Sequence, residues 1–294
     1  MKDRCEQGKE EPSDIGSYNC SSNRDRHSSQ HRHRQPSEVY ATPSVLMVMR
    51  HSERLDDCCS GWIEKCNKEG KYEPFDLNMP SRLPIARPLK DFTRDTCLTR
   101  SGVVLSQMVG RGLLLTDNTP DLIYSSPSLR CIQTAAWVRE MSGSRALVRV
   151  EPGLFENFQY PHGVPRFLTP LQRHAFPVDK AFRPFVSLET VTGRQESNDD
   201  YNERIRTVLK AIVEQTEVTK TAARQLKVLV VAHASTLDMA VGLMREKARK
   251  TVEMELDNIA IPKDNYWVPA PHQLPPVTYE FLSTRYNQHF VHRP

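Results

Sequence analysis

The sequence predicts a three-layer α/β/α sandwich with a mostly parallel central sheet. Two short runs, residues 45–49 and 228–232, contain only apolar residues, which is typical of strands buried on both faces of a parallel sheet. Apolar residues also recur at helical spacing in several segments between and after them. Strands that alternate with helices, without an internal repeat, indicate a single α/β domain over residues 44–294.

Residues 1–43 differ from the rest of the chain in composition. They are mostly Ser, Arg, His, Glu and Gln, so they cannot bury enough apolar surface to offset the entropy of ordering. We therefore expect a disordered polar tail. His27, His31 and His33 could form a metal-binding tract, but their loose spacing and the intervening arginines favour a solvated low-complexity segment.

The first apolar run ends abruptly at Arg50, His51, Glu53 and Arg54. Ligands of open α/β sheets bind outside the carboxyl ends of the strands, so we expect these side chains at the lip of a pocket. Guanidinium groups repel one another without a partner, and phosphate accepts their forked donors. Two arginines around one histidine therefore favour an anion, and an ordinary solvated loop is the alternative.

A long segment with four prolines, residues 58–94, follows this strand. The prolines prevent a long helix, so we expect an ordered insertion that shapes the mouth of the pocket. Apolar residues at helical spacing then predict a helix over 101–115.

A second candidate anion-binding residue lies at a predicted helix N-terminus. A short strand over 121–124 leads into Ser126 and Pro127, which suit the N-cap and the first position of a helix that ends near Gly143. Arg130 then lies in the first turn, where backbone N–H groups and the positive end of the helix dipole favour an anion.

The C-terminal half continues the alternation of strands and helices. Its predicted elements are a strand over 147–150, a helix over 199–218 capped by Asn198, a strand over 228–232, a helix that begins near Ser235 and a late strand over 276–282. The strand over 228–232 ends at His233, so two buried strands each finish on a histidine. One such histidine is usually satisfied by local hydrogen bonds, but a second one beside paired arginines favours a shared site.

Composition limits the classes of partner. The net charge of +4, without a dense run of Lys and Arg, is too small to indicate nucleic acid. The chain has neither eighteen consecutive apolar residues nor an apolar segment at its start, so we expect no membrane span and no standard secretion signal. Its seven irregularly spaced cysteines favour reduced thiols and a cytoplasmic protein.

Four motifs occur in the chain order of a known family. They are Arg50-His51-x-Glu53-Arg54 and the blocks at residues 125–135, 151–156 and 232–238. In these motifs the chain resembles the histidine phosphatase (phosphoglycerate mutase-like) superfamily. Segments 71–72, 76–80 and 90–92 are similar to the branch that contains the suppressor-of-T-cell-receptor-signalling phosphatases and the ecdysteroid-phosphate phosphatases.

The resemblance implies a phosphomonoester hydrolase that works through a phosphohistidine, without a cofactor or a metal. The implied catalytic residues are His51 as nucleophile, Glu156 as proton donor and His233 as a donor to the phosphoryl oxygens; the implied phosphate-binding residues are Arg50, Arg54 and Arg130. Such cations would lower the pKa of the attacking histidine and match the charge of the transition state. The partner is then a phosphate ester, and the resemblance also implies a homodimer.

A metal site built from His51, Glu53, His233 and Asp238 is the rival interpretation. It would hold a cation beside three guanidinium groups, which is electrostatically costly. Glu53 is then better interpreted as a structural partner of an arginine or of the following turn.

One residue departs from the family pattern. Ser52 stands where the family has glycine, and if that position requires a positive φ, serine costs about 1 kcal/mol. A weakly active or inactive phosphatase fold that serves as a scaffold or binding protein is therefore the alternative function. Phosphoryl transfer between hydroxyls, as in a mutase, is a third. Phe155, Phe158 and Tyr160 near Glu156 suggest phosphotyrosine or another aromatic or apolar ester, although such residues often only pack.

Overall fold

A computed structural model of the chain describes residues 44–156, 164–193, 195–219 and 225–258. The predicted tail and the predicted late strand over 276–282 lie outside these ranges, as do Phe158 and Tyr160.

A four-stranded parallel sheet forms the centre of the described structure, in the order β1-β6-β4-β5. Its strands are β1 (Val45–Arg50), β4 (Leu122–Ser125), β5 (Val148–Val150) and β6 (Lys227–Ala232). In the β1–β6 pair Arg50 lies opposite Ala232, and the His51 N–H donates to the Ala232 carbonyl at 2.9 Å. The residues that follow these two strands therefore leave the same edge of the sheet side by side.

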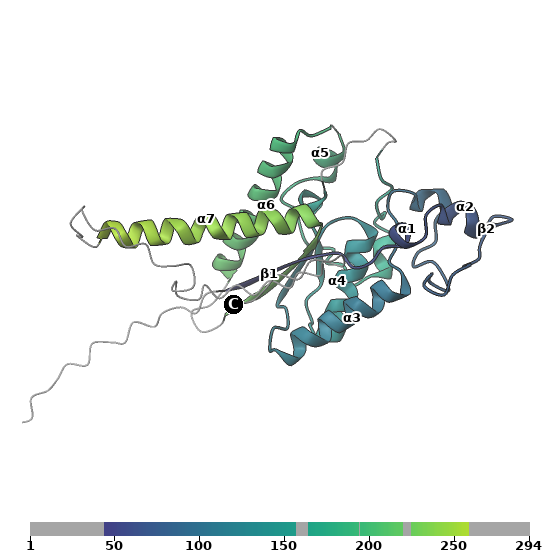
Figure 1. Cartoon of the computed structure of the whole chain (residues 1–294), viewed down its shortest axis with the longest axis horizontal. Helices are drawn as coiled ribbons and strands as arrows, with labels where there is room; N and C mark the ends of the chain where they lie inside the picture. The colour runs from purple at the N-terminus through teal and green to yellow at the C-terminus, as the bar shows by residue number, and fades with distance from the viewer. Residues whose placement is uncertain (1–43, 157–163, 194, 220–224, 259–294) are drawn as a thin grey trace, which may run out of the picture. The chain divides into compact units, whose positions relative to one another are not determined.

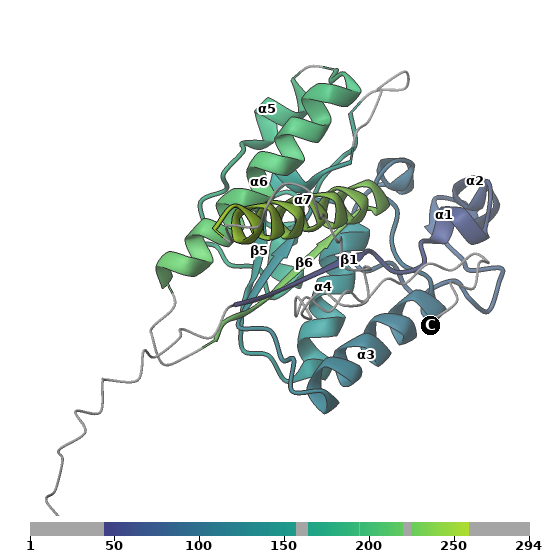
Figure 2. The same cartoon turned by 60° about the vertical axis from the view of Figure 1, so that its left-hand side comes forward.

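Helices cover both faces of the sheet, as Figures 1 and 2 show. Helices α3 (Arg100–Leu115) and α4 (Leu129–Ser142) pack on one face, and α6 (Asn198–Thr219) and α7 (Ala234–Asn258) on the other. Alternate strand residues supply the two cores: Met49 and Val231 face α3 and α4, whereas Val48 and Val230 face α6 and α7. The predicted α/β fold with a mostly parallel sheet is confirmed.

The insertion after β1 contains only short elements, as its prolines predict. They are α1 (Leu55–Cys58), α2 (Trp62–Cys66), β2 (Asn67–Lys68), β3 (Lys71–Tyr72) and η1 (Leu89–Phe92). The insertion has its own apolar cluster around Trp62, Met79 and Phe92, which continues onto Leu129 and Ile132 of α4. The remaining short elements are η2 (Pro152–Leu154), η3 (Gln172–Ala175) and α5 (Leu188–Thr192).

Both predicted N-caps are wrong. Helix α4 begins at Leu129 with Ser128 as N-cap, and the carboxylate of Asp95 accepts the Leu129 N–H at 2.7 Å. Helix α6 is capped by Ser197, whose Oγ accepts the N–H of Asp200 at 3.1 Å. Ser126 does not cap α4 because its hydroxyl is hydrogen-bonded to His233 instead.

The helices of the described ranges include none with the length and apolar character needed to cross a membrane.

Candidate active site

His51 follows β1 and is only 5% exposed. Its Nδ1 lies 2.8 Å from the Ser52 carbonyl, which can only accept, so Nδ1 carries the proton and Nε2 keeps its lone pair. Burial and then the charge of Arg130, with smaller effects of Arg50 and Arg54, lower the pKa of His51 well below its usual value. The imidazole is therefore neutral at pH 7.

His233 follows β6 and faces His51. The two ring centroids lie 5.6 Å apart, with the ring planes at 70°. Burial, followed by the charge of Arg130, lowers the pKa of His233 well below its usual value. The structure thus brings the two predicted strand-end histidines together, each in its neutral form.

The orientation of His233 is fixed by hydrogen-bonding groups on opposite sides of the ring. Its Nε2 lies 2.8 Å from Ser126 Oγ, and its Nδ1 lies 3.4 Å from Arg130 Nη2. An arginine nitrogen can only donate, so Nδ1 accepts and Nε2–H donates to the serine. Ser126 therefore anchors the ring, whereas the sequence predicted that it would cap a helix.

Arg130 and Glu156 form an ion pair at the same place. Arg130 lies in the first turn of α4, as predicted, and is only 2% exposed. Its Nη2 donates to Glu156 Oε1, and Glu156 Oε2 lies 3.5 Å from His233 Nδ1. The buried Nε of Arg130 has no hydrogen-bond partner in the described structure. A buried guanidinium with an unused donor is suited to an anion with several oxygens.

Arg50 and Arg54 complete the positive charge around the two histidines, since both contribute to the lowered pKa of His51 and of His233. Arg54 also forms ion pairs through Nε, at 3.0 Å with Asp56 and at 2.9 Å with Asp57. Those carboxylates offset part of its charge.

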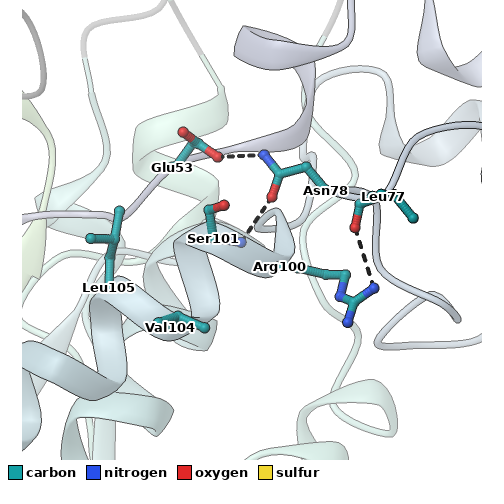
Figure 3. A pocket seen from close by; sticks show the side chains of 7 residues that line it. All are labelled: Glu53, Leu77, Asn78, Arg100, Ser101, Val104 and Leu105. Atoms are coloured by element: carbon teal, nitrogen blue, oxygen red, sulfur yellow. Dashed lines mark hydrogen bonds between the residues drawn. The ribbon is translucent and has the colours of Figure 1, made fainter.

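Glu53 lies in a hydrogen-bonded network outside the histidine pair. Its Oε1 accepts from Thr99 Oγ1 at 2.6 Å and from Asn78 Nδ2 at 2.9 Å, and Asn78 Oδ1 accepts the Ser101 N–H at 2.9 Å. Figure 3 shows the bonds of Asn78 to Glu53 and to Ser101, beside a surface cavity of about 640 Å³. Glu53 is thus structural, but it joins the insertion to α3 instead of orienting an arginine. Gly102 permits this contact, because a Cβ there would lie 2.3 Å from the Glu53 carbonyl oxygen.

Ser52 has an ordinary backbone conformation. Among the described non-glycine residues only Glu69 and Asp117 have positive φ. The Ser52 N–H donates to Thr134 Oγ1 at 3.0 Å, and Thr134 Oγ1 donates to the Arg130 carbonyl at 2.8 Å. The condition under which serine would cost backbone strain is therefore not met.

Phe155 is part of the core. It is 1% exposed, and its ring meets Phe167 and His233 edge-on at 4.9 Å and 5.7 Å. It supports His233 from within the core. A cavity of about 920 Å³ between β1 and α3 has Arg50, His51 and Ser52 in its wall, but not Arg130, Glu156 or His233.

The rival metal site is not assembled. Glu53 points to Asn78 and Thr99, and no group of three or more His, Cys, Asp or Glu side chains in the described ranges could hold a metal ion.

Asp95, in contrast, was not predicted from the sequence, although it supports the site. Its carboxylate is fully buried, it caps α4 next to Arg130, and it pairs with Arg87 at 3.2 Å. Asp95 lies 34 positions before Leu129, and nothing in the local sequence links the two.

A parallel α/β sandwich whose neighbouring strands end in facing histidines, beside a buried arginine, has the features of a histidine phosphatase. The family model for the histidine phosphatase superfamily (branch 1) matches residues 91–263, and the chain belongs to this superfamily.

Two relatives identify the branch of the superfamily to which the chain belongs. The chain is 37% identical over 208 residues to an ecdysteroid-phosphate phosphatase of Drosophila melanogaster, covering 68% of this chain and 26% of the relative. It is 32% identical over 237 residues to the ubiquitin-associated and SH3 domain-containing protein B of Homo sapiens, covering 75% of this chain and 36% of that protein. The matches therefore span only about a quarter to a third of these relatives. The predicted branch is confirmed.

A solved structure agrees with this assignment. The ecdysone phosphate phosphatase of Bombyx mori in complex with tungstate superposes with a TM-score of 0.60 at 28% identity, covering 79% of this chain and 85% of that one.

Proposed function

We propose that the protein is a phosphomonoester hydrolase that works through a phosphohistidine at His51. The observation that carries the proposal is the pair of buried, neutral histidines beside Arg130, with Nε2 of His51 free to attack. A histidine nucleophile must be unprotonated, and the arginines that hold it so also suit a phosphate dianion.

In the first step the phosphate ester takes over the hydrogen bonds that Arg130 now makes with Glu156, and it also engages the free Nε. Once the phosphate has replaced it at Arg130, Glu156 is in its acid form. Nε2 of His51 attacks phosphorus, the bond to the ester oxygen breaks, and Glu156 donates its proton to that oxygen. Arg50 and Arg54 stabilise the charge on the remaining phosphoryl oxygens. For His233 to donate to them as well, the phosphate replaces Arg130 at Nδ1, the ring proton moves to Nδ1, and the Ser126 hydroxyl turns to donate to Nε2.

In the second step Glu156 accepts a proton from water, which attacks phosphorus and breaks the bond to His51. Inorganic phosphate leaves, and both catalytic groups return to their starting states. Three arginines already offset the charge of a phosphate dianion, so we propose that the reaction needs no metal or other cofactor.

The proposed substrates are phosphotyrosine or other aromatic or apolar phosphate esters. The names of the relatives, which include ecdysteroid-phosphate phosphatases, support an apolar ester. Compartment and assembly are part of the same proposal: a cytoplasmic enzyme, to which the five free cysteines of the described ranges are suited, that forms a homodimer.

The test is phosphate release from an aryl phosphate by the purified protein, with His51→Ala as the control. We expect turnover that vanadate inhibits and EDTA does not, and an acid-labile phosphoprotein after brief mixing with substrate. Equal turnover by His51→Ala would exclude the nucleophile, and strong inhibition by EDTA would support the metal site instead.

A further inference from the structure

Arg204 lies on α6, away from the two histidines, and its side chain is almost fully buried. Its Nη1 donates to two backbone carbonyls, Gly153 at 2.7 Å and Phe155 at 3.0 Å. Both carbonyls belong to the loop that leads to Glu156. The guanidinium therefore holds the backbone directly before the proposed proton donor.

Glu196 fixes the guanidinium in turn. Nε and Nη2 of Arg204 each donate to one carboxylate oxygen of Glu196 at 2.6 Å, so the pair is bidentate. This pairing satisfies the charge of a buried arginine and sets the plane of its fork. Nη1 is then directed at the loop, a geometry that lysine, with its single ammonium group, cannot reproduce.

Two further contacts hold the same loop. Glu151 Oε1 accepts the Gly153 N–H at 2.8 Å, and a Cβ on Gly153 would lie 2.5 Å from Val208 of α6. The loop thus packs closely on α6, with its N–H bound by Glu151 and its carbonyls bound by Arg204. Glu156 lies one residue beyond the last bound carbonyl.

We propose that Arg204, held by Glu196, is a positioning residue that fixes the carboxyl group of Glu156 at the oxygen of the leaving group. A proton donor has to lie within hydrogen-bonding reach of that oxygen, and displacement by about 1 Å costs about 100-fold in rate. Arg130 attracts the same carboxylate. The backbone bonds of Arg204 limit how far the Glu156 side chain can move toward Arg130. The inference rests on the proposed function, because it assigns a support to the proton donor of that reaction.

The experiment compares two esters that differ in their need for an acid. Dinitrophenolate leaves without a proton, whereas phenolate, whose conjugate acid has a pKa of about 10, needs one. The readout is kcat/KM, because it reports transfer to His51 and not the later hydrolysis. For Arg204→Lys and Glu196→Gln we expect about a 10- to 100-fold loss on phenyl phosphate and less than about a twofold loss on dinitrophenyl phosphate.

The matched control is Arg206→Lys. Arg206 lies on the same helix and pairs with Glu246 at 3.2 Å, but none of its hydrogen bonds reaches the loop. It should behave as wild type on both esters. Glu196→Gln keeps the shape of the pair, so it tests the proposal even if Arg204→Lys does not fold.

Two outcomes would overturn the inference, and they are distinguishable. If Glu156→Gln shows the selective loss but the Arg204 and Glu196 variants lose equally on both esters, the positioning role is wrong and the proposed function remains. If Glu156→Gln keeps the kcat/KM of the wild type on phenyl phosphate, Glu156 is not the proton donor. Arg204 then has no proton donor to position.

Discussion

Single hydroxyl groups orient the histidines of the candidate site. Ser126 accepts the Nε2–H of His233, so Ser126→Ala should leave that buried donor with only the sulfur of Cys131, 3.9 Å away, and should cost about 1–3 kcal/mol in the free energy of unfolding. We expect about a tenfold or greater fall in kcat with a smaller change in KM. Ser125→Ala is the matched control, because Ser125 is equally buried and its hydroxyl donates to the Ser126 carbonyl and not to a histidine. An equal fall in both variants would argue against a specific role of Ser126.

Ser52 allows a test of the alternative function as a decayed enzyme. Its φ is not positive, so Ser52→Gly relieves no strain and only adds freedom to the unfolded chain. We expect a change in kcat/KM of less than about threefold and a loss of about 0.5–1 kcal/mol in the free energy of unfolding. Steady-state kinetics with urea unfolding measure both. A large gain in turnover would instead identify serine as the cause of a weak active site.

The two histidines also make stability depend on pH. Both have a pKa well below the value of about 6.5 that histidine has in an unfolded chain. Below that pH the unfolded chain binds protons that the folded state excludes. As the pH is lowered, the free energy of unfolding therefore falls by about 1.4 kcal/mol per pH unit for each histidine. Above about pH 7 both states are neutral, and the contribution no longer changes.

Urea unfolding at several pH values between about 5 and 7.5 measures this slope, and His233→Gln should make it shallower. Burial raises the pKa of Asp95 and of Glu151, so these two groups favour the folded state as the pH falls. This opposite effect is present in the wild type and in His233→Gln alike. The comparison therefore uses the difference between the two slopes. Identical slopes would mean that His233 is not held neutral.

At the scale of the elements, apolar runs and helical spacing predicted the strands and helices well. Two fully apolar strands in a parallel sheet end at one edge, so the meeting of His51 and His233 followed from the pattern. The cap of α4 was missed because it depends on distant groups: Asp95 reaches α4 from directly after the insertion, and Ser126 turns to a histidine 107 positions away. The cap of α6 is a local bond of Ser197, one residue before the predicted Asn198. Arg204 was missed for the same reason, since its partners are carbonyls that carry no sequence signal.

The connection between the insertion and α4 can be tested at Asp95. Asp95→Ala removes the cap of α4 and leaves Arg87 buried without its partner carboxylate, which should cost about 3–5 kcal/mol in urea unfolding. The double variant Asp95→Ala with Arg87→Met removes the unpaired charge and should recover part of that loss. If the effects of the two substitutions on the free energy of unfolding are additive, the charge of the Asp95–Arg87 ion pair does not stabilise α4.

Taken as a whole, the molecule places its candidate anion site where both helical layers meet the sheet. Arg130 comes from α4 on one face, the loop before Glu156 is bound by α6 on the other, and the histidines end β1 and β6 between them. An oxyanion bound there contacts Arg130 of α4 and the histidines that follow β1 and β6, and this arrangement exists only in the folded state, so the anion should stabilise the entire domain. At 100 times its dissociation constant, a ligand adds about 2.7 kcal/mol, or about 5–10 °C in Tm for a domain of this size.

Inorganic phosphate should therefore raise Tm in proportion to the logarithm of its concentration, and chloride at matched ionic strength should not. Arg130→Met should abolish the shift whatever its own Tm, because it removes the buried donors that phosphate needs. Arg139→Met is the control, because Arg139 lies on the same helix and donates to the Ala146 carbonyl at 2.6 Å, away from the histidines. If phosphate still stabilised Arg130→Met as strongly as wild type, the anion would have to bind elsewhere, and the layers would not be joined through this site.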